Sequence, residues 1–71
     1  MPNGDGGNLK MFAIFNFHNV EPEQWNTEAA RHLRIFADYI ETNGLNLPSG
    51  RFENGTLYER HGRSIFEYSQ R

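Results

Sequence analysis

The sequence predicts a small α+β domain in which one helix packs on a three- to four-stranded antiparallel sheet, in the order β-α-β-β-β. Three observations predict this fold. Large apolar residues crowd residues 9–18, apolar residues recur every three or four positions between 22 and 43, and residues 51–68 alternate around two Gly-containing turns. With 71 residues, the chain is long enough for one small domain.

The composition excludes several classes of protein. The chain has no cysteine, so disulfides, zinc ribbons and thiol catalysis are ruled out. No apolar run approaches the roughly 18 residues that a membrane-spanning helix needs, and no charged-then-apolar leader is present. We therefore expect a cytoplasmic protein with no membrane partner. Six Phe, three Tyr and one Trp supply the apolar area that so short a chain needs for a core.

Residues 1–8 predict a flexible tail, because they contain three Gly and no apolar residue after Met1, and residues 9–71 predict a single domain. Residues 9–18 predict a strand. One face of that strand carries Met11, Ala13, Phe15 and Phe17, and the other carries Lys10, Phe12, Ile14, Asn16 and His18. Because both faces are apolar in the middle, we expect a central strand that is covered on each side.

Residues 22–43 predict the helix. Pro22 suits the first helical position, and a later start at Thr27, capped by Asn26, is the alternative. Gly44 can adopt the left-handed conformation that ends a helix. One apolar stripe is expected to face the sheet, and it consists of Trp25, Ala29, Leu33, Phe36 and Ile40.

Residues 51–68 predict a meander of three strands, joined by two-residue turns at Asn54-Gly55 and His61-Gly62. The first strand is expected to join this meander at an edge or beside the last strand. The turns set a register in which Arg60 and Arg63 are cross-strand neighbours. An apolar face then collects Phe52, Leu57, Phe66 and Tyr68, and a polar face collects Arg51, Glu53, Thr56, Tyr58, Arg60, Arg63, Ile65 and Glu67.

A search for catalytic motifs finds no phosphate-binding loop, nucleophile elbow or paired carboxylates, and the three histidines lack metal-ligand spacing. One hypothesis is a small nuclease with His61 as the base and nearby arginines on phosphate. A lone histidine with no orienting carboxylate is a poor catalyst. We therefore expect a protein that is not an enzyme and that uses no metal or other cofactor.

The sheet face opposite the helix is the predicted binding surface. It is expected to bring together Phe12, Arg51, Tyr58, Arg60, Arg63 and Ile65. Aromatic and Arg side chains around an apolar centre are typical of interface hot spots. An acidic partner would relieve the repulsion between neighbouring Arg60 and Arg63. The competing explanation is a solvated face on which Glu53, Glu59 and Glu67 balance the arginines locally.

The sequence thus predicts a non-enzymatic module that binds another protein with an acidic surface, as an inhibitor or adaptor of the kind that phages make. It would act by occluding a surface of its partner. The alternative is a single-stranded nucleic-acid-binding domain, because residues 10–17 partly match an aromatic RNA-binding strand and bases can stack on Phe12 and Tyr58. A homodimer that buries the second apolar face of the first strand is a further alternative, as are contacts through an edge strand or the acidic helix face.

Overall fold

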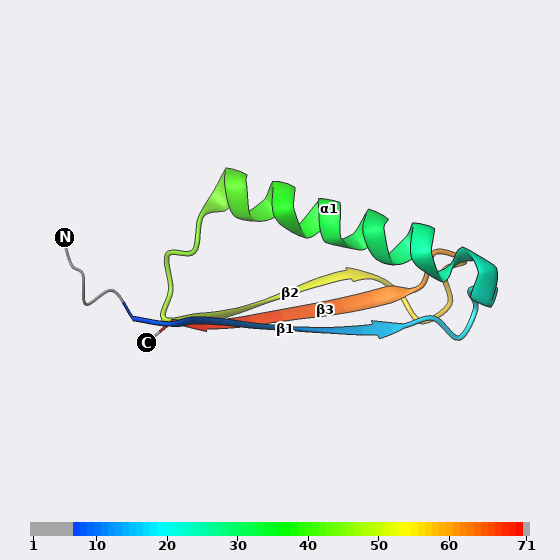
Figure 1. The fold of residues 1–71 in the computed structure, drawn as a ribbon, viewed down its shortest axis with the longest axis horizontal. Helices are drawn as coiled ribbons and strands as arrows, with labels where there is room; N and C mark the ends of the chain where they lie inside the picture. The colour runs from blue at the N-terminus through cyan, green and yellow to red at the C-terminus, as the bar shows by residue number, and fades with distance from the viewer. Residues whose placement is uncertain (1–6, 71) are drawn as a thin grey trace.

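The structure is a computed structural model that describes residues 7–70, so most of the predicted tail, residues 1–6, and Arg71 lie outside the described residues. The elements are β1 (Leu9–Asn16), the short 3-10 helix η1 (Pro22–Gln24), α1 (Trp25–Asn43), β2 (Ser49–Gly55) and β3 (Arg63–Gln70). The helix forms one layer and the three-stranded antiparallel sheet the other (Figure 1), which confirms the α+β class. The order is β-α-β-β, one strand fewer than the expected β-α-β-β-β.

The central strand of the sheet is β3, with β1 and β2 on either side, both antiparallel to it. The first strand therefore lies at an edge and beside the last strand, as predicted. The expectation that it is a central strand covered on both faces is wrong. One helix covers only one face of a sheet, so Phe12 and Ile14 on the other face of β1 are 66% and 62% exposed. The predicted assignment of residues to the two faces of this strand is confirmed by its register against β3.

The expected meander is a two-stranded hairpin with a long connection. Asn54 and Gly55 do not form a two-residue turn, because they are the last residues of β2 and pair with Ser64 and Arg63. Residues 56–62 form the connection. Two backbone hydrogen bonds hold it together, from the N–H of Glu59 to Thr56 and from the N–H of Gly62 to Glu59.

The observed register explains why the two-residue turn is not made. Phe52 lies opposite Phe66, which places two large rings under the helix, and Asn54 reaches the buried side chain of His32. A tight turn at Asn54-Gly55 would remove both arrangements. The predicted division into faces is nevertheless correct within the strands. Phe52, Phe66 and Tyr68 lie toward the helix, and Arg51, Glu53, Arg63, Ile65 and Glu67 lie on the open face.

The ends of the helical segment follow the sequence closely. Pro22 begins η1, which leads directly into α1, so the later start at Thr27 is wrong. Gly44 ends α1 with φ of 76°, a conformation that glycine adopts without steric cost. Its N–H donates to the carbonyl oxygen of Ile40 at 2.7 Å, which satisfies one of the free carbonyl groups at the helix end.

A stack of aromatic rings forms the core. The rings of Phe36 and Phe66 lie almost parallel, with their centroids 4.3 Å apart, and Phe15 meets Phe66 edge-on at 5.8 Å. Tyr39 covers Phe52 at 4.5 Å on the β2 side. Only four hydrophobic residues among those described are buried, and they are Val20, Phe36, Phe66 and Tyr68. The core is small, so each of these rings matters for stability.

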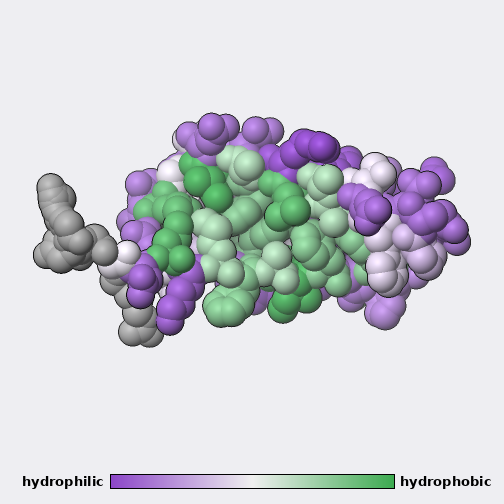
Figure 2. Space-filling view, in the orientation of Figure 1, coloured by the Kyte–Doolittle hydropathy of each residue, from purple (hydrophilic) through white to green (hydrophobic). Residues whose placement is uncertain are grey.

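The helix is rotated relative to the predicted apolar stripe. The buried residues of α1 are Glu28, His32 and Phe36, whereas Trp25 and Leu33 are each 49% exposed. Trp25 packs against Phe17, just after β1, and Leu33 lies two turns further along the same flank. Hydrophobic side chains form a continuous area between the helix and the strands on the side that Figure 2 shows.

We expect Phe66→Ala to lower the free energy of unfolding by about 3–5 kcal/mol, because it removes the ring at the centre of the stack and leaves a cavity. Urea denaturation followed by circular dichroism measures the change. Tyr58→Ala, which removes an aromatic side chain that is 87% exposed, is the control and should have little effect. If Phe66→Ala is unfolded without urea, Phe66→Leu gives the measurable comparison. Equal effects of the Phe66 and Tyr58 variants would contradict the assigned core.

Candidate protein-interaction surface

The structure divides the six predicted surface residues into two groups. Phe12, Arg51, Arg63 and Ile65 lie on the open face of the sheet, away from the helix. Tyr58 and Arg60 lie in the 56–62 connection, beyond the end of the sheet. The sheet therefore brings four of the predicted residues together, and the other two are separate because the strand expected to carry them is a loop.

The arginines of the open face are already paired. Arg63 donates to Glu53 at 2.8 Å, and Arg51 lies 3.0 Å from the other oxygen of Glu53 and 3.9 Å from Glu67. Hydrogen bonding from Arg63 is the main cause that holds the pKa of Glu53 below its ordinary value. The expectation that Arg60 and Arg63 are cross-strand neighbours is wrong, because Arg63 lies opposite Asn16 and Gly55.

This pairing changes the character of the open face. The expected repulsion between two adjacent arginines does not arise, and the local balance by Glu53 and Glu67 that the competing explanation required is present. Exposed ion pairs of this kind contribute at most about 1 kcal/mol each. The open face is thus close to neutral, and its distinguishing feature is apolar rather than cationic.

The most exposed apolar element of the sheet is β1. Four of its large side chains are at least 42% exposed, on both faces of the strand, and they are Leu9, Met11, Phe12 and Ile14. In the part of the chain that the structure describes, β1 pairs only with β3, so its outer edge presents unpaired backbone N–H and C=O groups there. Lys10 is the one charged residue of the strand, and the strand contains no proline. Features that normally protect an edge strand are therefore missing along its central part.

An open groove of about 1120 Å³ continues from the C-terminal end of this strand to the start of α1. Phe15, Phe17, Trp25 and Ala29 contribute its apolar wall. The indole N–H of Trp25 donates to the carbonyl oxygen of Val20 at 3.0 Å, which fixes the ring at the groove. The β1 edge and this groove meet at Ile14 and Phe15, and we call the two together the β1 surface.

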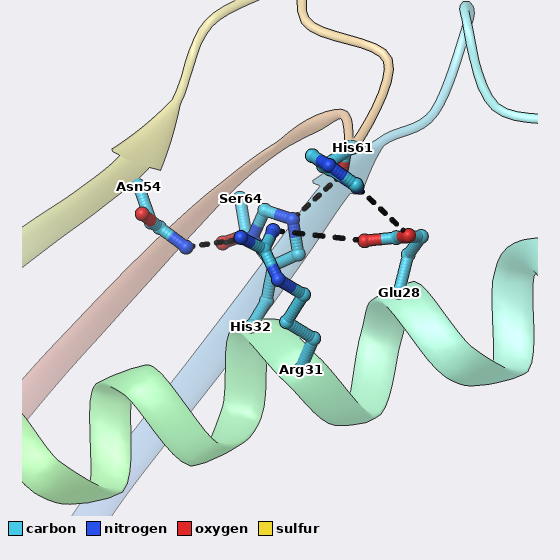
Figure 3. Close-up of polar contacts among 6 residues, drawn as sticks. All are labelled: Glu28, Arg31, His32, Asn54, His61 and Ser64. Carbon is cyan, nitrogen blue, oxygen red and sulfur yellow. Dashed lines mark hydrogen bonds and ion pairs between the residues drawn. The ribbon is translucent and has the colours of Figure 1, made fainter.

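A buried polar cluster links the helix to the 56–62 connection (Figure 3). His32 is 1% exposed and Ser64 is fully buried, with 2.6 Å between His32 Nδ1 and Ser64 Oγ. His32 Nε2 lies 2.7 Å from the carbonyl oxygen of His61, so this nitrogen carries a proton and donates. In the neutral ring, Nδ1 then accepts from the Ser64 hydroxyl, with the side-chain amide of Asn54 at 3.1 Å.

A second histidine of the cluster, His61, is held by a carboxylate. Its Nδ1 lies 2.9 Å from Glu28 Oε2, and Arg31 lies 3.8 Å from the other oxygen of Glu28. The hydrogen bond from His61 is the largest cause that lowers the pKa of Glu28. The expectation that His61 has no orienting carboxylate is wrong. Residue spacing could not reveal this contact, because the two residues are 33 positions apart.

The His32–Ser64 pair of the polar cluster is closed to solvent. Ser64 and His32 have the spacing of a nucleophile and its base, but neither is exposed to a substrate. The His61 side chain is 45% exposed, yet its backbone carbonyl anchors the connection through His32. Among residues 7–70 no group of three or more His, Asp or Glu is arranged to hold a metal ion. The contacts of His32 and Glu28 with His61 attach the 56–62 connection to the helix.

Comparisons with known proteins add no assignment to this geometry: no protein-family model, curated protein or solved structure matches the chain. Within the described part of the chain, no helix is long and apolar enough to cross a membrane.

We expect the free energy of unfolding to fall as the pH is lowered below about 5, partly through Glu28. Because its pKa is lower in the folded than in the unfolded chain, the ionised carboxylate stabilises the fold above its unfolded pKa. That contribution is lost as the pH falls through the folded pKa. Glu28→Gln should lower stability at neutral pH and flatten the acid slope, measured by urea denaturation at several pH values. Glu41→Gln, at an exposed helix position, is the control, and identical slopes would contradict the role of Glu28.

We expect Ser64→Ala to destabilise the fold by about 1–3 kcal/mol, because it leaves a buried ring nitrogen of His32 with a weaker partner. Thermal and urea denaturation measure this loss. Ser69→Ala on the same strand, which changes a half-buried serine on the opposite face, should cost less. Equal losses in the two variants would show that the His32–Ser64 hydrogen bond contributes nothing measurable.

Proposed function

We propose that this protein is a non-enzymatic protein-binding module that engages its partner through the β1 surface. One observation carries the proposal: β1 is an apolar edge strand whose side chains and outer backbone edge are both exposed. An exposed strand edge gives a partner main-chain hydrogen bonds, and its alternating side chains give specificity. Monomeric proteins normally avoid such edges, so a strand of this kind is typical of an interaction site.

The proposed contact is mainly apolar. Phe12 and Ile14 supply exposed side chains on the open face, and Trp25 lines the groove at the end of the strand. A partner segment in extended conformation, with apolar residues at alternate positions, fits this surface. Arg51 and Arg63 are engaged by glutamates, which weakens the argument for an acidic partner surface. An acidic character of the partner stays a prediction that depends on Lys10 and Arg60.

The small size of the module is the basis on which we propose an inhibitor or adaptor role. A domain this small, bound along one strand, would act by covering a surface of its partner rather than by chemistry. The cysteine-free composition supports a cytoplasmic location, which we propose with this role. Single-stranded nucleic acid is the alternative ligand, with bases stacked on Phe12. The neutral balance of charges on the open face favours a protein partner.

The experiment is an affinity capture from a lysate of the source cells, with wild-type protein and two matched variants. Phe12→Ala removes an exposed aromatic from β1, and Tyr58→Ala removes one from the 56–62 connection. We expect Phe12→Ala to lower retention of the captured protein at least tenfold and Tyr58→Ala to leave it unchanged. Mass spectrometry identifies what each sample retains.

Nuclease treatment and a salt series separate the alternative. Retention that vanishes with nuclease and falls steeply with salt would move the assignment to nucleic acid. Retention lost in Tyr58→Ala but kept in Phe12→Ala would place the contact on the connection and reject the β1 surface. If wild type and Phe12→Ala retain the same proteins, the proposed function is wrong.

A further inference from the structure

We propose that the occupant of the β1 edge is a second copy of this chain, paired antiparallel to β1 around a two-fold axis at Ala13. This inference rests on the proposed function, because it names the partner of the same surface. The two sheets would join into one, with β1 of each copy at the centre. Such an interface is isologous, so the same surface must be complementary to itself.

The division of β1 into faces restricts the register. Residues that lie opposite each other in an antiparallel pair point to the same face of the sheet. In β1, Met11, Ala13 and Phe15 face the helix side, whereas Phe12 and Ile14 face the open side. The two-fold axis must therefore pass through a residue. An axis between two residues would set Phe12 opposite Ala13 and place an open-face side chain against a helix-face one.

Of the permitted registers, the one centred on Ala13 fits best. It places Phe12 opposite Ile14 of the partner subunit, and Met11 opposite Phe15 of the partner subunit. Lys10 then lies opposite Asn16 of the partner subunit, and all of β1 beyond Leu9 is paired. The small side chain of Ala13 meets its own copy at the axis without crowding.

The neighbouring registers are poorer. An axis at Phe12 sets Lys10 against Ile14 of the partner subunit, an ammonium group against an apolar side chain. An axis at Ile14 places Lys10 opposite a residue beyond the end of β1, so fewer strand residues pair. With the axis at Ala13, no two charges of like sign face each other along the seam, because Lys10 is the only charged residue of β1.

Pairing in this register covers the exposed apolar residues on both faces. On the open face, Phe12 and Ile14 of the two copies form one cluster beside Ile65, which lies opposite Ile14 in the sheet. A two-fold axis perpendicular to the sheet puts both helices on the same side. The flanks of α1 that carry Trp25 and Leu33 then face each other across the two β1 strands. Figure 2 shows hydrophobic side chains between the helix and the strands on one side of the molecule.

The other edge strand, β2, is less suited to pairing with a second copy than β1. The β2 strand carries Arg51 and Glu53 on the open face, and only Phe52 is large and apolar. Charged residues at an edge oppose pairing with another strand. The centre of β1 has no such protection. A second copy presents the same alternation of apolar residues in the order that this register requires.

The test uses cysteine substitutions in a chain that has no cysteine. In Ala13→Cys, the new thiol lies opposite its own copy at a Cα separation of about 4.5–5.5 Å, within the range of a disulfide. We expect mild oxidation to convert this variant to a covalent dimer of twice 8.3 kDa. A mixture of Phe12→Cys and Ile14→Cys should also cross-link, because residue 12 of one variant lies opposite residue 14 of the other. This pair and the Ala13 pair are adjacent, so one is a hydrogen-bonded pair and the other is not. The two experiments together therefore test both geometries for a disulfide. A Leu47→Cys control, with its thiol outside the sheet, should form no covalent dimer under the same oxidation.

Sedimentation equilibrium of the unmodified protein provides the second measurement. We expect a mass of twice 8.3 kDa that shifts to 8.3 kDa on dilution. Ile14→Lys, at a position 62% exposed in one chain, should abolish the dimer, and Leu47→Lys, at a position 61% exposed outside the sheet, should leave it intact. Because both changes are at exposed positions, the single chain should still fold, which circular dichroism verifies.

The outcomes separate this inference from the proposed function. A monomer at every concentration, with no cross-link, overturns the second copy as occupant. The affinity capture that compares wild type with Phe12→Ala then tests the proposed function independently. A dimer that Ile14→Lys leaves intact and that Ala13→Cys does not trap overturns pairing through β1. A trapped dimer whose wild-type form captures no other protein supports the inference and rejects an adaptor or inhibitor role.

Discussion

The hydrogen bonds of the buried His32 side chain set the relation between the helix and the sheet. Its two ring nitrogens meet Ser64 on the central strand and the backbone of His61 in the 56–62 connection. Leaving either partner unsatisfied in the interior would be costly. The helix therefore turns His32 toward the sheet, and Glu28, one turn earlier, reaches the side chain of His61. Two segments far apart in the sequence are joined in this way.

The orientation of the helix also determines which apolar side chains stay exposed. With His32 and Phe36 facing the sheet, Trp25 and Leu33 lie on the flank of the helix, half exposed. A single helix covers one face of the three-stranded sheet, and within residues 7–70 no helix or strand covers the open face of β1. The strand with the greatest apolar content is also one of the two edge strands. The proposed interaction surface is the consequence of a polar contact at the centre of the fold.

The charged and aromatic residues on the surface have separate roles. Arg51 and Arg63 hold Glu53 on the open face, and this pairing leaves the face nearly neutral. The two histidines of the polar cluster attach the 56–62 connection to the helix. What remains for recognition is apolar area and backbone edge, which favours partners that contribute a strand.

The sequence by itself determined the elements that depend on neighbouring residues. The alternation in β1, the helical segment from Pro22 to the glycine cap at Gly44, and the face shared by Phe52, Phe66 and Tyr68 follow from local periodicity and turn chemistry. The tertiary structure decided the rest. The position of β1 at the edge, the fate of Asn54-Gly55, the ion pairs of Arg63 and the Glu28–His61 contact all depend on which distant groups satisfy one another. Hydrogen bonds between distant groups leave no periodic signal in the chain, and here they outweigh the local preference of a strong turn dipeptide.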